Sequence, residues 1–196
     1  MTVDVRVVAI PVVVARRGPL DLPVIMGLAA DADAHLPNGP WAAAPLGRDA
    51  RDTAWGLVSE LSESAEVANL TTLLKIDKTN LQPVEFVDRD DRLVLIYTMA
   101  LPSGWTEVLS LRDRWIPLCN TRPSRHDGAR LGRRQLASER VAPYGSLILD
   151  HWRQLLEETP AVLSFLAPFF TLAQARDVYS AVWGYTQDAN HWREWA

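Results

Sequence analysis

The stretch RDARDTAWGLVSELSE, from Arg48 to Glu63, predicts an amphipathic helix in a half of the chain that is otherwise rich in strand patterns. Its apolar residues are Ala50, Ala54, Leu57, Val58 and Leu61. Spacings of four, three, one and three residues place them on one side of an α-helix. A helix with one apolar stripe needs an apolar surface to cover, and the flanking segments predict that surface.

Three runs rich in β-branched and aromatic residues predict strands around this helix. They are VRVVAIPVVVA (5–15), with a break expected at Pro11, LDLPVIMGL (20–28) and DRLVLIYTMAL (91–101). RRGP (16–19) and DRDD (88–91) are the turn signals beside them. Strands with a helix between them imply an α/β layer fold.

The composition changes after Cys119. The segment NTRPSRHDGARLGRRQLASER (120–140) carries six arginines against two acids and few large apolar residues, which is typical of a linker or an exposed loop. Beyond it, LILDHWRQLLEET (147–159) predicts a helix with one apolar face. That face holds Leu147, Ile148, Trp152, Leu155 and Leu156.

Capping residues predict two further helices near the end of the sequence. Thr171 suits the N-cap of LAQARDVYSAVWG, and Gly184 suits its C-cap. Asp188 can cap a last helix, ANHWREWA. We therefore expect three parts: residues 1–120 as an α/β domain, 121–140 as an arginine-rich linker, and 141–196 as a small helical domain.

Composition excludes several classes of protein. The 196 residues are 48% hydrophobic and 22% charged, which suits one compact domain with an appendage or two small domains. A net charge of −4 gives no overall positive field for nucleic acid. The single cysteine and the four scattered histidines predict neither a disulfide nor a zinc site. The start has neither a leader's basic front nor a membrane span, so we expect a cytoplasmic protein without a membrane partner.

The order of elements resembles that of a known fold. A strand, LPNG (36–39), a loop, the helix and then RLVLIYTMAL (92–101) look like a Nudix fold. FFTLAQARDVYSAVWGYTQDANHWRE (169–194) resembles the C-terminal winged helix of the Nudix-related transcriptional regulators, the NrtR-like proteins. The resemblance implies a Nudix-like α/β/α sandwich with a mixed sheet, followed by a small all-α winged-helix-like domain. No β-wing is expected after Ala196.

Active Nudix enzymes place an arginine and three glutamates around the equivalent helix, where the carboxylates bind divalent metal. Set against that pattern, Trp55 falls on the arginine, and Gly56 falls on the first glutamate. Ser59 and Glu60 fall on the paired glutamates. One acid of three remains, so we expect no metal site, no cofactor and no ordinary Nudix hydrolysis.

The resemblance then implies a non-catalytic regulator or binding protein, a homodimer, that senses a nucleotide-type ligand such as ADP-ribose or an NAD-related molecule. The ligand-binding candidates are Trp41, Asn38, Glu60 and Arg92, with Trp41 stacking on a base or ring. The alternative is a Nudix-superfamily hydrolase, or a repurposed biosynthetic enzyme, that uses acids outside the helix. Only this alternative would need Mg²⁺.

DNA binding is the second expectation that the resemblance raises. The candidate residues are Asn190, His191 and Arg193 of the last predicted helix, with Arg133 and Arg134 of the linker. From Ala137 to Ala196, however, four arginines stand against seven acids, a net charge of −3 that repels phosphate. The sequence therefore predicts weak DNA binding or none.

Overall fold

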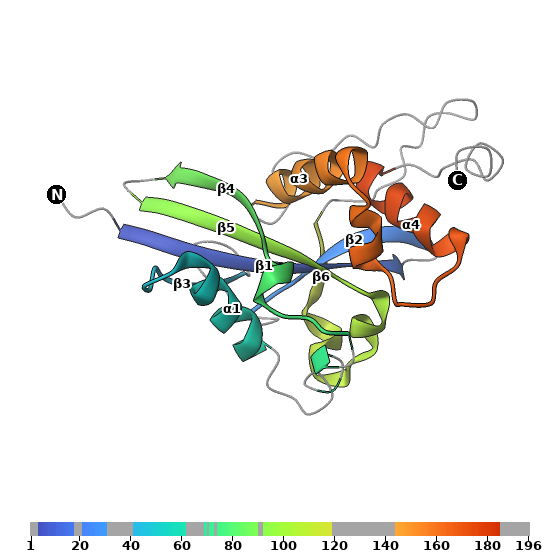
Figure 1. Cartoon of the computed structure of the whole chain (residues 1–196), viewed down its shortest axis with the longest axis horizontal. Helices are drawn as coiled ribbons and strands as arrows, with labels where there is room; N and C mark the ends of the chain where they lie inside the picture. Colours follow the sequence, from blue (N-terminus) through green and yellow to red (C-terminus); the bar gives the residue numbers. More distant parts are fainter. Residues whose placement is uncertain are drawn as a thin grey trace.

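A mixed sheet forms the centre of the protein in a computed structural model (Figure 1). The structure describes residues 4–17, 21–30, 41–61, 69, 71–72, 74–89, 92–118 and 144–184. The strands are β1 (Asp4–Arg17), β2 (Leu22–Leu28), β3 (Ala42–Pro45), β4 (Gln82–Arg89), β5 (Arg92–Leu101) and β6 (Trp115–Pro117). Their order is β4-β5-β1-β2-β6, and β3 also pairs with β1.

β1 is the central strand. It pairs in parallel with β5 from Asp4 opposite Arg92 to Val13 opposite Leu101. Its other edge pairs antiparallel with β3 and then with β2. One parallel pair among antiparallel neighbours makes the sheet mixed, as predicted.

The break expected at Pro11 is wrong, because β1 runs through this residue as one strand. Ala9 is the last residue paired with β3, and Val12 is the first paired with β2. Pro11 therefore lies where the partner on this edge changes. The fixed φ of proline is compatible with an extended backbone, so the strand continues.

The predicted amphipathic helix is confirmed as α1 (Ala50–Leu61). It packs on one face of the sheet with its stripe inward, since Ala54, Leu57, Val58 and Leu61 are buried. The 3-10 helices η2 (Ser103–Glu107) and η3 (Leu109–Arg114) add Trp105 and Leu111 to the same core. The sheet residues of this core include Val7, Ala9, Val13, Met26, Met99 and Leu101.

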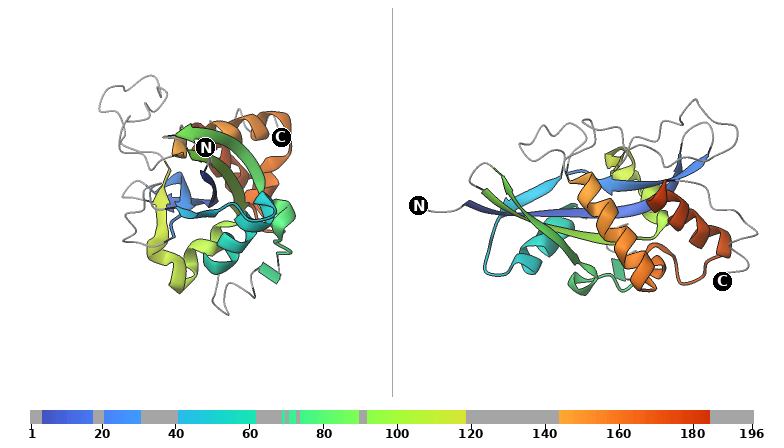
Figure 2. Two further views of the ribbon diagram at one scale, coloured as in Figure 1. Left: turned by 90° about the vertical axis from the view of Figure 1, so that its left-hand side faces the viewer. Right: turned by 90° about the horizontal axis from the view of Figure 1, so that it is seen from above.

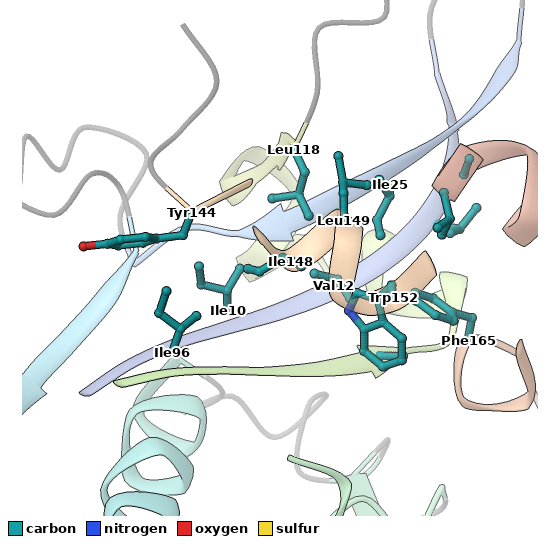
Figure 3. Close-up of a cluster of buried hydrophobic side chains, with 14 of the residues drawn as sticks. Ile10, Val12, Ile25, Ile96, Leu118, Tyr144, Ile148, Leu149, Trp152 and Phe165 are labelled. Atoms are coloured by element: carbon teal, nitrogen blue, oxygen red, sulfur yellow. The ribbon is translucent and has the colours of Figure 1, made fainter. Parts of the chain in front are cut away.

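The opposite face of the sheet is covered by α3 (Gly145–Glu158), the 3-10 helix η4 (Ala161–Phe165) and α4 (Leu172–Trp183) (Figure 2). The alternate residues of β1, Val8, Ile10, Val12 and Val14, point into this second core. Figure 3 shows Ile148, Leu149 and Trp152 of α3 beside Ile10 and Val12. Helices on both faces make the architecture a three-layered α/β sandwich.

A buried hydrogen-bond chain ties α3 to the sheet. The indole Nε1 of Trp152 donates to Thr98 Oγ1 at 3.3 Å. The same hydroxyl donates to the carbonyl oxygen of Ile10 at 2.8 Å. Phe165 of η4 meets the Trp152 ring edge-on, with the ring centroids 4.8 Å apart.

The predicted caps of α4 are confirmed. The hydroxyl of Thr171 accepts from the backbone N–H of Gln174, whose side chain accepts from the N–H of Thr171 in return. Gly184 ends the helix in the left-handed conformation, at φ 73°. The last helix predicted from Asp188 lies outside the described residues.

The two C-terminal helices share their core with the sheet. Val178, Ala181 and Val182 of α4 belong to the same buried cluster as Val12 and Ile25. In the part of the chain that the structure describes, α3 and α4 are therefore a layer of the α/β sandwich. The domain limits at residues 120 and 141, the linker 121–140 and the winged helix stay predictions, since they depend on residues outside this part.

Candidate ligand-binding site

The outer face of α1 carries the positions at which the resemblance places metal-binding acids. A Cβ atom added to Gly56 would meet nothing within 4 Å, so close packing does not explain this glycine. The hydroxyl of Ser59 donates to the carbonyl oxygen of Trp55 at 2.9 Å. Glu60 is exposed. This face therefore presents one carboxylate beside an open space.

These residues do not fit the divalent metal that a Nudix fold implies. Mg²⁺ takes oxygen ligands in near-octahedral geometry, and protein sites usually supply carboxylates. Of the nearby acids, Asp52 accepts from Lys78 Nζ at 2.7 Å. Among the described residues no three His, Cys, Asp or Glu side chains gather closely enough to hold a metal.

Trp41 is the predicted stacking residue, and its side chain is fully buried, at 0% exposure. Its ring lies against Gly27, and Leu118 also packs there. A base needs an exposed ring face on which to stack, and Trp41 offers none. Stacking by Trp41 stays a prediction, and this burial argues against it.

The other predicted ligand residues are not joined by contacts. Arg92 begins β5, where its Nε lies 3.6 Å from Asp4 Oδ2. The same oxygen accepts from Arg6 Nε at 3.2 Å. No hydrogen bond or ion pair that the structure describes links Arg92 to Glu60 on α1. Asn38, Asn190, His191, Arg193, Arg133 and Arg134 lie outside the described residues.

A cleft of about 820 Å³ lies at the carboxyl ends of the parallel strands β1 and β5. Val14, Ala15 and Arg16 of β1 line it from the sheet. Residues 102–107 line it from the α1 side, and residues 165–168 with the start of α4 line it from the other. Figure 1 shows α4 beside the end of β1. The carboxyl ends of parallel strands are a common place for ligands in α/β sheets.

Four charged residues line this cleft, which we call the charged cleft: Arg16, Glu107, Arg112 and Asp177. Arg16 is held on both sides, since its Nε and Nη2 donate to Asp177 at 2.9 Å and its Nη1 donates to the carbonyl oxygen of Asp21 at 2.9 Å. This hydrogen bond to Asp177 raises the pKa of the Arg16 guanidinium, although its burial opposes the shift. Arg112 and Glu107 are exposed and make no hydrogen bond or ion pair within the described ranges. Arg112 is thus the guanidinium available to a ligand.

Sequence reasoning missed the charged cleft. Arg16 stood in the predicted turn RRGP, and the pairing of β1 with β5 was not predicted. The only signal was that two long strand patterns, 5–15 and 91–101, each end beside polar or turn residues. A parallel pairing of these two strands would have brought their ends together.

Similarity to a solved Nudix family structure supports this architecture. No protein-family model matches the sequence, and no curated protein matches it. Among solved structures, the chain is similar to a MutT/nudix family protein from Enterococcus faecalis, with a TM-score of 0.61 and 15% identity over 99% of this chain and 80% of that chain. Shewanella oneidensis NrtR gives a TM-score of 0.48 at 13% identity, over 97% of this chain and 83% of that chain. The same protein complexed with a 27mer DNA gives 0.49 at 14% identity, over 97% and 80%.

The sheet, its two helical layers and the likeness to the Enterococcus faecalis protein define an α/β Nudix-like fold. The structural similarity supports the fold, but at 15% sequence identity it does not show a shared activity. No helix within the described ranges has the length and apolar character needed to cross a membrane.

Proposed function

We propose that this protein is a non-catalytic Nudix-like binding protein that senses a nucleotide-type ligand, such as ADP-ribose or an NAD-related molecule, in the charged cleft. One observation carries the proposal. The face of α1 that would hold metal in a Nudix enzyme has an open space at Gly56 and a single carboxylate, Glu60. A ligand held by such a protein is released intact, as a sensor requires.

The scarcity of free metal-binding oxygen atoms on α1 favours sensing over hydrolysis. Nudix hydrolysis depends on divalent metal, which polarises the diphosphate and positions water. The Ser59 hydroxyl is engaged by the Trp55 carbonyl, and the Asp52 carboxylate is engaged by Lys78. Glu60 alone is a poor site for a hard cation.

The size of the cleft and the guanidinium of Arg112, unengaged by any described residue, support an anionic small ligand, although the two arginines and two acids of the lining balance in net charge. Its volume of about 820 Å³ falls within the range of about 300–1,000 Å³ typical of small-molecule sites. A guanidinium matches the geometry of phosphate and can bind two of its oxygens at once. Arg112 offers that group, while Arg16 is already engaged by Asp177.

Calorimetry with ADP-ribose tests the proposal, with and without Mg²⁺ and with a parallel assay for released AMP. We expect binding that does not depend on Mg²⁺ and no AMP. Arg112→Ala should weaken binding by about tenfold or more, since a charge-assisted hydrogen bond contributes roughly 1.5–3 kcal/mol. Arg48→Ala, an exposed arginine outside the cleft, is the matched control and should change nothing. AMP formed only with Mg²⁺ would favour the hydrolase alternative.

We also propose that the protein is a homodimer, and the exposed apolar side chains Phe169 and Leu172, just before and at the start of α4, support this. They are 95% and 56% exposed, they line no cleft that the structure describes, and residues 169–175 contain no charged side chain. In a twofold-symmetric dimer the same surface of both protomers is in contact. An apolar surface without charges can pack against its copy in the other protomer without like-charge repulsion. Sedimentation should give twice the 21.9 kDa of the chain for the wild type, and a smaller species for Phe169→Asp. A monomeric wild type would contradict the proposal.

A further inference from the structure

A second cleft, of about 770 Å³, adjoins the charged cleft. Leu74, Pro102, Leu166, Ala167 and Pro168 line both of them. The remaining walls of the second cleft come from the 3-10 helix η1 (Lys78–Asn80), the start of β4, α3 and η4. The two clefts therefore lie side by side and share these residues as a common wall.

The second cleft differs from the first in its chemistry. No charged residue lines it, so we call it the neutral cleft. Its polar lining is Thr79, Asn80, Gln82, Thr159 and Ser164, and the rest is apolar. The charged residues around the two clefts thus all line the first one. A ligand that fills both clefts therefore places its charged part in the first cleft and an uncharged part in the second.

The neutral cleft has what a planar heterocycle needs. Phe170 lines it and is 42% exposed, so an aromatic ring is available there. The amide of half-buried Gln82 makes no hydrogen bond that the structure describes. Asn80 uses its Oδ1 to accept from the Asp77 N–H at 2.9 Å, which leaves its NH₂ group as a donor. Apolar faces and free amide groups together suit a base that is apolar above and below its plane and polar at its edge.

We infer that the two clefts are one bipartite site, which takes a nucleoside diphosphate with its phosphates in the charged cleft and its base in the neutral cleft. The inference rests on the proposed function and adds the orientation of the ligand to it. Arg112 binds the phosphates, and the uncharged walls exclude a second anionic group from the far end. The site therefore discriminates a nucleotide from a molecule with charges at both ends.

Calorimetry with two probes tests the orientation: ADP, which has both parts, and inorganic pyrophosphate, which lacks the base. Ser164→Asp introduces a carboxylate into the neutral cleft at an exposed position of η4. It should weaken ADP binding by about tenfold or more, because the base would have to desolvate that charge, and leave pyrophosphate binding unchanged. Ser146→Asp is the matched control, since Ser146 is exposed on α3 and lines neither cleft. Arg112→Ala should weaken the binding of both probes.

The outcomes separate the two proposals. If ADP binds and depends on Arg112, while Ser164→Asp binds it as tightly as Ser146→Asp does, the base lies elsewhere and the orientation is wrong, although nucleotide binding stands. If Ser164→Asp weakens pyrophosphate binding as much as ADP binding, the added charge acts at the phosphates, and the orientation is again wrong. If the wild type binds neither ADP nor ADP-ribose, both proposals fail.

Discussion

The backbone of Gly27 lies directly against the indole ring of Trp41. A Cβ atom on Gly27 would come within 2.7 Å of Trp41 Cζ3 and 2.9 Å of Leu118 Cδ2. Both contacting side chains are fully buried, at 0% exposure, so neither has free space into which to move. Glycine is therefore needed at this position of β2, because a larger side chain would overlap with Trp41 and Leu118.

We expect Gly27→Ala to lower the free energy of unfolding by about 1–3 kcal/mol, the usual effect of one extra methyl group in a packed core. Gly56→Ala is the control, because its Cβ would meet nothing and alanine is favoured in a helix. It should raise the free energy of unfolding by about 0.5–1 kcal/mol. Urea denaturation measures both, and equal effects of the same sign would contradict this account.

Restoring the missing carboxylates on α1 should create a metal site where the wild type has none. Gly56→Glu faces open space, and Ser59→Glu replaces an exposed hydroxyl, so both changes should leave the fold intact. With Glu60, the double variant would offer three carboxylates to one cation. Electron paramagnetic resonance of Mn²⁺ should detect bound metal in the double variant and only free Mn²⁺ in the wild type. Tight Mn²⁺ binding by the wild type would show that acids elsewhere form a site.

His151 on α3 should make the stability fall as the solution becomes acidic. Burial lowers the pKa of its imidazole below the ordinary 6.5, and its Nε2 is buried without a hydrogen-bond partner. Between that lowered pKa and 6.5 the unfolded chain binds more protons than the folded one, so stability rises with pH and is lost as pH falls through this window. Urea denaturation from pH 7 to pH 5 should show a shallower loss for His151→Leu. Asp150→Asn, at the exposed neighbouring position, should keep the loss seen in the wild type.

DNA binding through the C-terminal residues should be weak or absent. The net charge of −3 from Ala137 to Ala196 opposes phosphate contacts, and each contact that forms adds a salt slope of only about −0.9. Gel retardation at physiological salt should therefore show no specific complex at sub-micromolar protein. A specific complex that is lost in Arg193→Ala would overturn this prediction and favour a DNA-binding regulator.

Local patterns in the sequence predicted the local structure well. The apolar stripe of α1, the strand patterns of β2 and β5, and the caps Thr171 and Gly184 are all confirmed. Each depends on residues a few positions apart, whose spacing or capping chemistry acts within one element. β4 was not predicted, because Pro83 and the charged residues Glu85, Asp88 and Arg89 hide the pattern of this edge strand, in which Phe86 is 69% exposed.

The candidate site could not be predicted in the same way, because it depends on contacts between distant segments. The charged cleft needs β1 beside β5 and α4 beside both layers, and no local pattern encodes these neighbours. Trp41 was predicted to be a ligand residue because the resemblance places it beside the expected ligand cleft. Its packing on Gly27 follows from strand positions that only the folded sheet brings together.

The central position of β1 also determines when the chain can fold during synthesis. β1 is synthesised before its partners, since its parallel partner ends at Leu101 and the helix that completes the cover of its second face ends at Trp183. Ile10 and Val12 lack their helical cover until α3, which ends at Glu158, has been made. Contacts so distant in sequence form slowly, because a long loop must close before they form. The nascent chain must therefore keep β1 from other partners until α3 and α4 have been made.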